Sequence, residues 1–495
     1  MSDRIDKSLT RKKLDKTLKP HWVWAIALGS SIGWASFVMP ATWMGEAGPL
    51  GVILGLTLGA LLMIVISISY GVLIRNYPVS GGEFAYAFLG LSRLHAYISG
   101  WFLTLGYICI VALNATAFSL MLKFIFPNFI EQVKVYEIAG WEVYLTEILL
   151  ATILIGIFTV LNIRGTTISG RMQFIFVAIL IVGVLTITIG MTSSAETSFS
   201  NLTPLFTPEI SALAAILTIV AIAPFAYVGF DNVPQAAEEF KFSSKKALTL
   251  IVLAILFAAA IYSLMILATG VAAPWQEISQ ANHAWGTGFV VQEVLGTGGL
   301  IVLATALTMG IFTGLNGFLI SSSRVLFAMS RGKVLPKAFS NLHSRYNTPY
   351  FALIFAAVIA IIAPWFGREV LGWVVDMSSV GVSIAFFYTT YTAYKLLKWS
   401  EQDEGYNPEL HIVSPGKKVV TLLGMIASVS FLVLLLYPES PAALGMESIV
   451  ALLVWIAIGA IFYMIRRKEL AKYTREELAY LILGKDQFKL KKEEE

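Results

Sequence analysis

Two hydrophobic segments carry glycine and a closing proline at matching places in the two halves of the chain. The first is GSSIGWASFVMP, residues 29–40, and the second is APFAYVGFDNVP, residues 223–234. A helix that breaks at bilayer depth frees backbone N–H and C=O groups, and each unpaired group there costs several kcal/mol. Such breaks persist where the freed backbone lines a cavity or a ligand site, and a matching pair indicates a transporter's central site. We therefore predict a small-molecule site between these segments.

The second segment also contains Asp231, an ionisable residue at membrane depth. A carboxylate at the centre of a membrane helix costs about 2.5–3.5 kcal/mol on insertion scales, so such residues usually have a purpose. Asp231 could bind a cation, relay a proton or contact a basic substrate. It could equally accept hydrogen bonds from N–H groups freed at the break, with no transported species involved. Tyr107 and Asn316 could line the same cavity, although core packing is the simpler interpretation of both.

The elements that hold these residues must be membrane helices. Apolar residues make up 57% of the chain and charged residues 13%, and the mean hydropathy is +0.76, which is typical of a polytopic membrane protein. A helix needs about 20 residues to cross the hydrocarbon core. We predict an all-α protein with twelve membrane helices, near residues 22–44, 49–74, 96–126, 144–163, 172–192, 211–236, 247–272, 298–328, 350–366, 371–394, 419–437 and 448–465.

Positive charge predicts the orientation. Residues 1–21 contain seven Lys or Arg, and no Lys or Arg occurs between Lys246 and Arg324. With the N-terminus in the cytoplasm, only Lys123, Lys134 and Arg368 of the 35 basic residues fall on the outer side. This distribution follows the positive-inside rule. Because twelve helices return the chain to its starting side, both termini are expected to be cytoplasmic, in a multi-pass protein of the cell membrane.

The breaks also predict the internal organisation. Each begins a group of five helices, and a repeat of odd length must have inverted topology. We expect discontinuous helices 1 and 6, a 5+5 inverted repeat, and helices 11 and 12 outside it. The corresponding ranges are an N-terminal tail 1–21, a membrane domain 22–466 with repeats near 22–192 and 211–397 and extra helices at 418–466, and a C-terminal tail 467–495.

Several classes of protein are disfavoured. The single cysteine, Cys109, lies inside the third predicted helix, so we expect no disulfide-linked partner subunit. The net charge of +4 gives no support to nucleic-acid binding. The predicted helices show no metal-ligand cluster, phosphate loop or nucleophile–base pair. We therefore predict no enzyme activity, no cofactor and no certain metal site, with the lipid bilayer and a small solute as the partners.

Further motifs occur in a fixed order over nearly all of residues 22–400. They are Gly29, Ile32 and Gly33; Pro78, Gly81, Gly82, Tyr86, Gly100 and Trp101; residues 225–231 and 236–239; and SRVLFAMSRGKVLP at 323–336, followed by Thr348 and Pro349. This set resembles the amino acid–polyamine–organocation (APC) superfamily of permeases, in particular bacterial amino acid permeases. The last string is the most specific of the four.

The resemblance implies where a zwitterionic substrate binds. Half-helix N-termini suit a carboxylate, and freed carbonyls suit an ammonium group. It assigns the substrate carboxylate to the first break, at Ser31, Gly33, Trp34, Ala35 and Ser36. It assigns the ammonium group to carbonyls of the second break, at Phe225, Ala226 and Val228. Phe225 also resembles the family's aromatic gate, so the predicted gating and coupling residues are Phe225, Trp34 and Asp231.

The chain departs from the family at three places. Trp34 and Ala35 stand where a small residue and glycine are usual, so the indole could shrink the pocket or swing as a gate. Phe242 and Ser243 replace an asparagine–proline pair after the second break. Some proton-coupled members carry a lysine in the fifth helix, where this chain has Leu180, so coupling through a lysine is not expected.

The coupling ion remains open between H⁺ and Na⁺. The resemblance pairs sodium with carbonyls of the first helix and hydroxyls of the eighth, here Thr305, Thr308, Thr313 and Ser321, although such hydroxyls often bond their own backbone. Four charged residues could form ion pairs that close the cytoplasmic side of the protein, or they could simply be solvated. They are Glu238, Glu239, Lys241 and Arg324.

The function predicted from the sequence is a secondary active transporter that moves an amino acid across the cytoplasmic membrane by alternating access. An ion gradient or exchange would drive it. One alternative is an amine or polyamine permease or exchanger, which would normally require more than one carboxylate inside the membrane. Another is an amino-acid sensor on the same fold that transports nothing. Uptake measurements separate transport from sensing.

Overall fold

The computed structural model describes residues 11–138, 141–281, 283, 285–367, 370–402, 415–440 and 443–484. Sequence-based predictions for residues 1–10, for Arg368 and for the chain after residue 484 lie outside these ranges.

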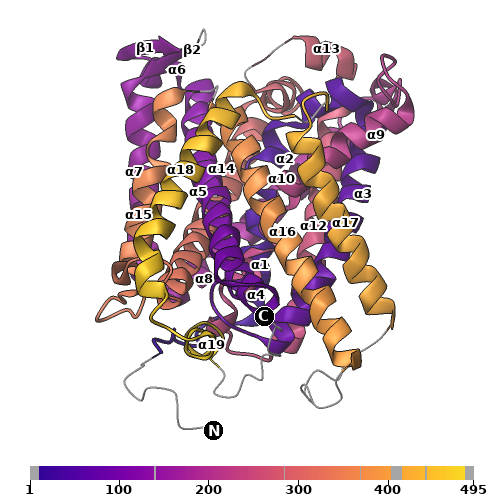
Figure 1. Cartoon of the computed structure of the whole chain (residues 1–495). Coiled ribbons are helices and arrows are strands. Elements are labelled where there is room, and N and C mark those ends of the chain that lie inside the picture. The colour runs from indigo at the N-terminus through magenta and orange to yellow at the C-terminus, as the bar shows by residue number, and fades with distance from the viewer. Residues whose placement is uncertain are drawn as a thin grey trace.

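The described residues form one bundle of long helices (Figure 1). Eight of these helices are long and apolar enough to cross a membrane: α3 (Pro40–Asn76), α5 (Arg93–Ile125), α7 (Leu145–Ile163), α8 (Thr166–Ser193), α12 (Ala247–Gly270), α14 (Gly286–Arg331), α17 (Pro415–Leu436) and α18 (Met446–Leu470). The bundle also contains α15 (Tyr350–Ala360), followed by a 3₁₀ turn at Ala363–Phe366, and α16 (Val370–Gln402). The prediction of a helical, multi-pass membrane protein is confirmed.

The two segments that were predicted to break do so. The first runs through α1 (Pro20–Ile32), α2 (Ala35–Val38) and the start of α3. The second is divided into α9 (Ala212–Ala221), α10 (Ala223–Tyr227) and α11 (Asn232–Gln235), with a 3₁₀ turn at Ala237–Glu239. Two long helices are kinked at glycines with positive φ, α3 at Gly48 (φ 72°) and α14 at Gly296 (φ 64°).

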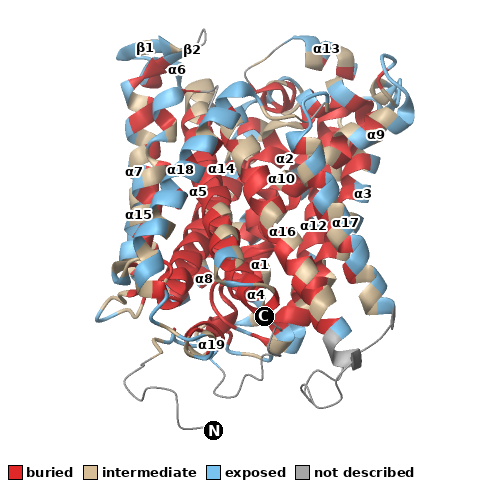
Figure 2. Cartoon of the chain, viewed as in Figure 1, coloured by how far each residue is buried: buried red, intermediate tan, exposed pale blue. Residues whose placement is uncertain are grey.

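The centre of the bundle is closely packed, and its outer surface is apolar. Figure 2 shows buried residues on the central helices and many exposed ones on the peripheral helices. Large apolar side chains are exposed there, including Ile157 of α7, Val182 of α8, Ile426 of α17 and Leu453 of α18. An apolar exterior is the arrangement that lipid favours, since the hydrocarbon core offers polar groups no hydrogen bonds.

Glycines on α14 bring this helix against the first break. A Cβ atom on Gly310 would stand 2.2 Å from the carbonyl oxygen of Gly33, and one on Gly317 would stand 2.0 Å from Oγ of Ser30. Any larger residue at either position would force the helices apart. Small residues allow such close helix approach in membranes, and here they set the position of the break against α14.

The bundle has two different ends (Figure 1). At one end, called here the terminal face, lie residues 11–19, α4 (Gly82–Gly90) and α19 (Arg475–Leu483). At the opposite end, the distal face, lie α6 (Pro127–Ile130), the antiparallel strands β1 (Lys134–Ile138) and β2 (Trp141–Tyr144), and α13 (Trp275–Gln280). Shorter 3₁₀ turns connect the helices at Phe199–Leu202, Ser244–Lys246 and Lys337–Ser340. Thr474 and Glu477 form a capping box at the start of α19.

Candidate functional site

The two breaks lie against each other. Gly33 ends α1 with φ 49° and ψ −138°, and Gly229 follows α10 with φ 128°. A Cβ atom on Gly229 would stand 2.5 Å from the backbone nitrogen of Ser31, so the second break fits against the first only with glycine there. The hydroxyl of Ser31 donates to the carbonyl of Tyr227 (3.1 Å), which joins the breaks directly.

Tyr262 of α12 binds the freed carbonyls of both breaks. Its hydroxyl lies 3.2 Å from the carbonyl oxygen of Ser31, 3.4 Å from that of Ile32 and 3.0 Å from that of Ala226. The sequence analysis did not identify this residue, because a tyrosine in an apolar helix carries no local signal of its partners. The protein thereby supplies a donor to backbone oxygens that the breaks leave without helical partners.

A cavity of about 510 Å³ extends from the first break toward the distal face. Its lining is apolar near the break, at Trp34, Ile222, Phe225, Met121 and Leu307. Nearer the distal face it includes Thr42 and Glu46, both exposed, and residues of the α13 region such as Ser279, His283 and Trp285. The cavity is thus open to solvent on the distal side and large enough for a small solute.

The predicted binding residues take different positions around this cavity. Trp34 and Phe225 line it. The remaining residues of the two breaks are buried behind that wall: Ser31, Gly33, Ala35, Ser36, Ala226 and Val228. The residue before α14, Trp285, also lines the cavity, and its indole nitrogen donates to the carbonyl of Phe37 (2.8 Å). The geometry therefore gathers the predicted residues into one region and exposes two of them to the cavity.

Asp231 lies within the second break and is fully buried. Its Oδ1 accepts the backbone N–H of Gly229 (2.6 Å), and its Oδ2 accepts the hydroxyl of Tyr107 (2.8 Å). Tyr107 therefore meets the break through Asp231 and does not line the cavity, contrary to the role considered for it. The carboxylate accepts an N–H group freed by the break, which is one of the roles considered for it.

A second buried acid lies beside Asp231. Gln235 donates from Nε2 to the hydroxyl of Tyr107 (3.2 Å) and also to Oε2 of Glu83, on α4. The other oxygen of Glu83 accepts the hydroxyl of Tyr70 (2.9 Å). Neither Glu83 nor Gln235 was predicted as a site residue. Glu83 stands in the Pro78–Tyr86 motif between two membrane helices, where a carboxylate is expected in solvent, and a buried acid there is visible only in the tertiary structure.

Asn316 of α14 belongs to a separate polar cluster. It accepts from Ser169 (2.7 Å) and Asn162 (3.1 Å) and donates to Oε1 of Gln173 (2.7 Å). Gln173 of α8 in turn donates to the carbonyl oxygens of Ala25 (3.3 Å) and Thr313 (3.1 Å). The cluster braces α8 and α14 against α1, and the binding role predicted for Asn316 stays a prediction.

The hydroxyls considered for sodium are already engaged, with one exception. Thr305 and Thr308 donate to carbonyls of their own helix. Thr313 donates to the carbonyl of Gly29 on α1 (2.9 Å). The Ser321 hydroxyl is buried and has no hydrogen-bond partner among the described residues. Thr313 and Gln173 thus donate to carbonyl oxygens of the first helix, those of Gly29 and Ala25.

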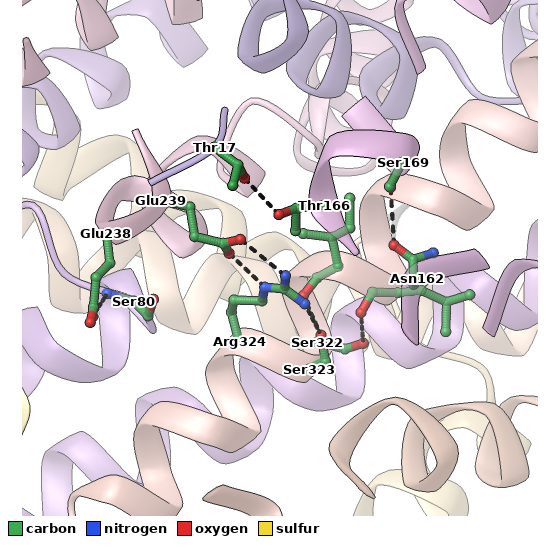
Figure 3. Close-up of polar contacts among 12 residues, drawn as sticks. Thr17, Ser80, Asn162, Thr166, Ser169, Glu238, Glu239, Ser322, Ser323 and Arg324 are labelled. Carbon is green, nitrogen blue, oxygen red and sulfur yellow. Dashed lines mark hydrogen bonds and ion pairs between the residues drawn. The ribbon is translucent and has the colours of Figure 1, made fainter. Parts of the chain in front are cut away.

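Ion pairs close the terminal face. Arg324 of α14 donates from Nε to Oε1 of Glu239 (2.8 Å) and from Nη2 to Oε2 of the same residue (3.2 Å), a two-point contact in a buried setting (Figure 3). Glu238 pairs with Arg331 (2.9 Å) and with Arg11 (3.1 Å), and it accepts the backbone N–H of Ser80. Ion pairing and solvation were both considered for this cluster. Glu238, Glu239 and Arg324 are buried and paired, whereas the side chain of Lys241 is exposed.

Residues 11–19, called here the N-terminal strap, lie across these pairs. The backbone N–H groups of Thr17 and Leu18 both donate to the carbonyl of Glu239 (3.0 Å each), and Lys241 donates back to Leu18 (2.9 Å). Thr17 also hydrogen-bonds to Thr166 of α8 (2.8 Å; Figure 3). The strap ties the end of the second break to α8, so the terminal face is closed while the distal face is open.

The charges at this face affect one another. Burial by itself would raise the pKa of the Glu238 carboxyl, but Arg331 and Arg11 outweigh burial and hold that pKa below its usual value. Glu83 has no such cation beside it: burial first, and then the charge of Asp231, raise its pKa from 4.5 to about 8. The pKa values of these two carboxyl groups are therefore shifted in opposite directions. Within the described ranges, no group of three or more His, Cys, Asp or Glu side chains is placed to hold a metal ion.

Comparison with known proteins agrees with this arrangement. Residues 22–460 match the family described as "Amino acid permease". The branched-chain amino acid permease BcaP of Bacillus subtilis (strain 168) is 25% identical over 500 residues, which cover 95% of this chain and 97% of the relative. The aromatic amino acid transport protein AroP of Escherichia coli O157:H7 is 24% identical over 70% of this chain and 73% of its own length. The methylthioribose transporter of Bacillus subtilis (strain 168) is 24% identical over 74% of this chain and 79% of its own length.

These relatives are permeases and transporters, which confirms that the chain is not an enzyme. The family match covers most of the chain, including both breaks and the ion-paired face. The resemblance noted in the sequence is therefore confirmed, and the chain belongs to the amino acid permease family of the APC superfamily.

Proposed function

We propose that this protein is a secondary active transporter that carries an amino acid across the cytoplasmic membrane by alternating access. The observation that carries the proposal is the cavity at the two adjoining breaks, open toward one face and closed by ion pairs at the other. A solute site reached from one side at a time is what alternating access requires. The relatives named above, which include amino acid permeases, support the same substrate class.

The orientation follows from charge. The terminal face carries the basic N-terminal strap together with Arg324 and Arg331. Under the positive-inside rule this face is cytoplasmic, and the cavity then opens to the outside. The proposed topology has twelve membrane helices arranged as a 5+5 inverted repeat, in which α1–α2 and α9–α11 are the discontinuous helices. This topology accounts for both breaks, and it also accounts for the two described ends lying on one face. The conformation is then outward-facing.

The chemistry of the cavity favours an amino acid with an apolar side chain. Its wall beside the first break is formed by Trp34, Ile222, Phe225 and Leu307. A branched or aromatic side chain fits this surface through burial of apolar area. The substrate carboxylate would be bound at the first break around Gly33–Ser36. Its ammonium group would be bound by carbonyls of the second break, where Ala226 already accepts from Tyr262 and has one lone pair left.

The coupling ion we propose is the proton. Carbonyls of α1 that would suit sodium accept hydrogen bonds from Thr313 and Gln173. A buried pair of carboxyl groups, Asp231 and Glu83, lies directly beside the second break. Carboxyl groups held apart from water are suited to bind and release protons. Leu180 of α8 is buried and apolar, so coupling would not use a lysine at that position.

A test is uptake into proteoliposomes of labelled leucine, isoleucine, valine, phenylalanine, lysine, putrescine and methylthioribose. Proton and sodium gradients are imposed separately. We expect accumulation of branched or aromatic amino acids that requires a proton gradient, acid outside. Sodium-dependent uptake that ignores pH would overturn the proton coupling. Uptake of none of the amino acids would overturn the function itself.

A second candidate is an amine or polyamine permease or exchanger. Two carboxylates, Glu46 and Asp376, line the cavity between the break and the distal face. They would attract a cation toward the site. In the same uptake panel, putrescine accumulation above that of every amino acid would favour this candidate. Uptake that occurs only against a preloaded substrate would identify an exchanger.

A further inference from the structure

A chain of buried hydrogen bonds connects the second break with α4. It runs from Asp231 to the Tyr107 hydroxyl (2.8 Å), from that hydroxyl to Nε2 of Gln235 (3.2 Å), and from the same Nε2 to Glu83. Tyr70 ends the chain by donating to Oε1 of Glu83 (2.9 Å). Asp231, Gln235 and Glu83 are each 0% exposed. Two carboxyl groups are thus linked inside the protein through a phenol and an amide.

The charges around this chain are not balanced by a cation. The ion pairs of the described residues include none with Glu83 or Asp231. Basic groups on the elements that pack against α4 have partners of their own: Arg324 with Glu239, Lys395 of α16 with the carbonyl of Gly90, Arg475 of α19 with the carbonyl of Leu91, and Arg93 of α5 with the carbonyl of Leu470. The other titratable groups nearby are the phenols of Tyr70, Tyr86 and Tyr107 and, farther along α5, His95 with Tyr388 of α16. Two buried like charges this close strongly disfavour double ionisation, so the pair holds a proton.

The hydrogen bonds indicate which carboxyl holds it. Both oxygens of Asp231 accept hydrogen bonds, one from the N–H of Gly229 in the break and one from the hydroxyl of Tyr107 on α5. Donors to both oxygens stabilise an ionised carboxylate. The side-chain amide of Gln235 can hydrogen-bond to Glu83 in either charge state. Its N–H group donates to the ionised carboxylate, and its carbonyl oxygen can accept from the protonated carboxyl group. The Gln235 carbonyl oxygen is buried and has no partner among the described residues. After rotation of the amide, it could accept a hydrogen bond from a neutral Glu83.

We propose that Glu83 is the group that binds the transported proton, while Asp231 remains ionised in the break. This inference rests on the proposed function and goes beyond it, because it assigns the coupling to a residue of the α4 segment. The step is simple protonation: the carboxylate of Glu83 takes up one proton on the outward-facing side of the cycle and releases it to the cytoplasm. One O–H bond forms on Glu83 and later breaks, and no group changes its oxidation state.

The position of α4 explains how this proton would be coupled to movement. Just before α4, the backbone N–H of Ser80 donates to Glu238 of the closed terminal face (3.2 Å). A Cβ atom on Gly81 would stand 2.2 Å from Cβ of Ala328, so this segment lies directly on α14. Glu83 therefore lies between the substrate break on one side and the ion-paired face on the other. A change of its charge acts on both, which is what coupling between two sites requires.

The first arm of the test does not depend on transport. Purified protein is titrated with pH while infrared difference spectra record the carbonyl stretch of protonated carboxyl groups. We expect a band that titrates near neutral pH and is absent from Glu83→Gln but present in Asp231→Asn and in Glu147→Gln. Glu147 is the matched control, because it is also buried but pairs with Lys123 on the distal side (3.1 Å). A band that persists in Glu83→Gln and disappears in Asp231→Asn would overturn the assignment.

The second arm measures transport by the same variants in proteoliposomes. Glu83→Gln should lose accumulation driven by a proton gradient by about tenfold, yet retain exchange of labelled against unlabelled substrate. Glu83→Asp should restore part of the gradient dependence, and Glu147→Gln should keep all of it. Full gradient-driven accumulation by Glu83→Gln would overturn the proposal. If the wild-type protein transports no amino acid, the proposed function fails, and the infrared arm alone decides whether Glu83 holds the proton.

Discussion

At the scale of single residues, the site depends on two glycines and one indole. Gly33 and Gly229 adopt positive φ at the two breaks, where an L side chain is strained. Trp34 follows Gly33 directly, so the indole is placed by the same turn that opens the helix. The backbone conformation at the breaks therefore sets the positions of the residues that shape the cavity.

Gly229→Ala is expected to destabilise the protein and to abolish transport. The φ of 128° costs about 1–3 kcal/mol for a residue with a Cβ atom. The new Cβ would also stand 2.5 Å from the nitrogen of Ser31, so the breaks must separate. The measurement is the thermal unfolding midpoint in detergent together with substrate uptake. The matched control is Gly156→Ala on α7, where nothing lies within 4 Å of the added atom. Equal behaviour of both variants would contradict the close fit of the two breaks.

Trp34→Gly is expected to widen the range of accepted side chains. The indole lines the cavity beside Phe225, so its removal leaves room for bulkier substrates. We expect uptake of the larger amino acids to rise relative to the smaller ones by about tenfold. The measurement is competition by a panel of unlabelled amino acids. Trp365→Gly, at an exposed tryptophan away from the cavity, serves as control. Unchanged selectivity in Trp34→Gly would place the indole outside the substrate pocket.

At the scale of elements, the terminal face is held by side chains from three separate segments and by a backbone carbonyl from a fourth. The N-terminal strap, the turn after α11 and the end of α14 meet there through Arg11, Glu238, Glu239, Arg324 and Arg331, and α19 contributes the carbonyl of Leu481. Truncating one partner of a buried pair leaves an uncompensated charge, which is strongly destabilising. The same property would suit this assembly to act as a gate under the proposed function, since breaking the ion pairs would give a second, open arrangement.

Arg324→Gln is expected to shift the protein toward opening at the terminal face. The carboxylate of Glu239 then loses its two-point contact with the guanidinium. The measurement uses a Cys109→Ala background with Ser321→Cys, a buried position on α14, and a membrane-impermeant thiol reagent. Labelling should rise several-fold over the Arg324-containing parent. Lys123→Gln, which breaks an ion pair on the distal side, should leave the labelling low. No rise in labelling with Arg324→Gln would argue against a gate.

At the scale of the whole molecule, a buried acid network and a closed face are joined through α4. This arrangement makes stability depend on pH. The pKa of Glu83 is raised by burial and by Asp231 from 4.5 to about 8, so the folded protein binds a proton that the unfolded chain releases. The contribution of Glu83 to the free energy of unfolding is fully present below pH 4.5 and is lost as the pH rises toward about 8.

We therefore expect the thermal unfolding midpoint of the wild-type protein to fall as the pH is raised from 5 to about 8. Glu83→Gln, which cannot ionise, should flatten this dependence and be relatively more stable at the alkaline end. The measurement is thermal unfolding in detergent across the pH range, with Glu147→Gln as a control that keeps the wild-type slope. A wild-type midpoint that rises over the same range would show that Glu83 is ionised in the folded protein.

The sequence by itself determined the membrane class, the approximate positions of the long apolar helices and the places where two helices break. These features depend on local properties, namely runs of apolar residues and the presence of Gly33, Gly229 and nearby prolines. The family motifs also located Trp34 and Phe225, which line the cavity. Ion pairing was one of two possibilities considered for Lys241, but its side chain is exposed and Arg331 and Arg11 bind Glu238 instead.

Only the tertiary structure decided which polar side chains meet. Glu83 looks like a solvated loop residue in the sequence, and its burial against Gln235 and Tyr70 arises because α4 packs beneath the second break. Tyr262 and Gln173 bind carbonyls of helices far away in the chain, so no local pattern marks them. The physical reason is that helix formation depends on neighbouring residues, whereas the partner of a buried polar group depends on how helices from distant parts of the chain pack together.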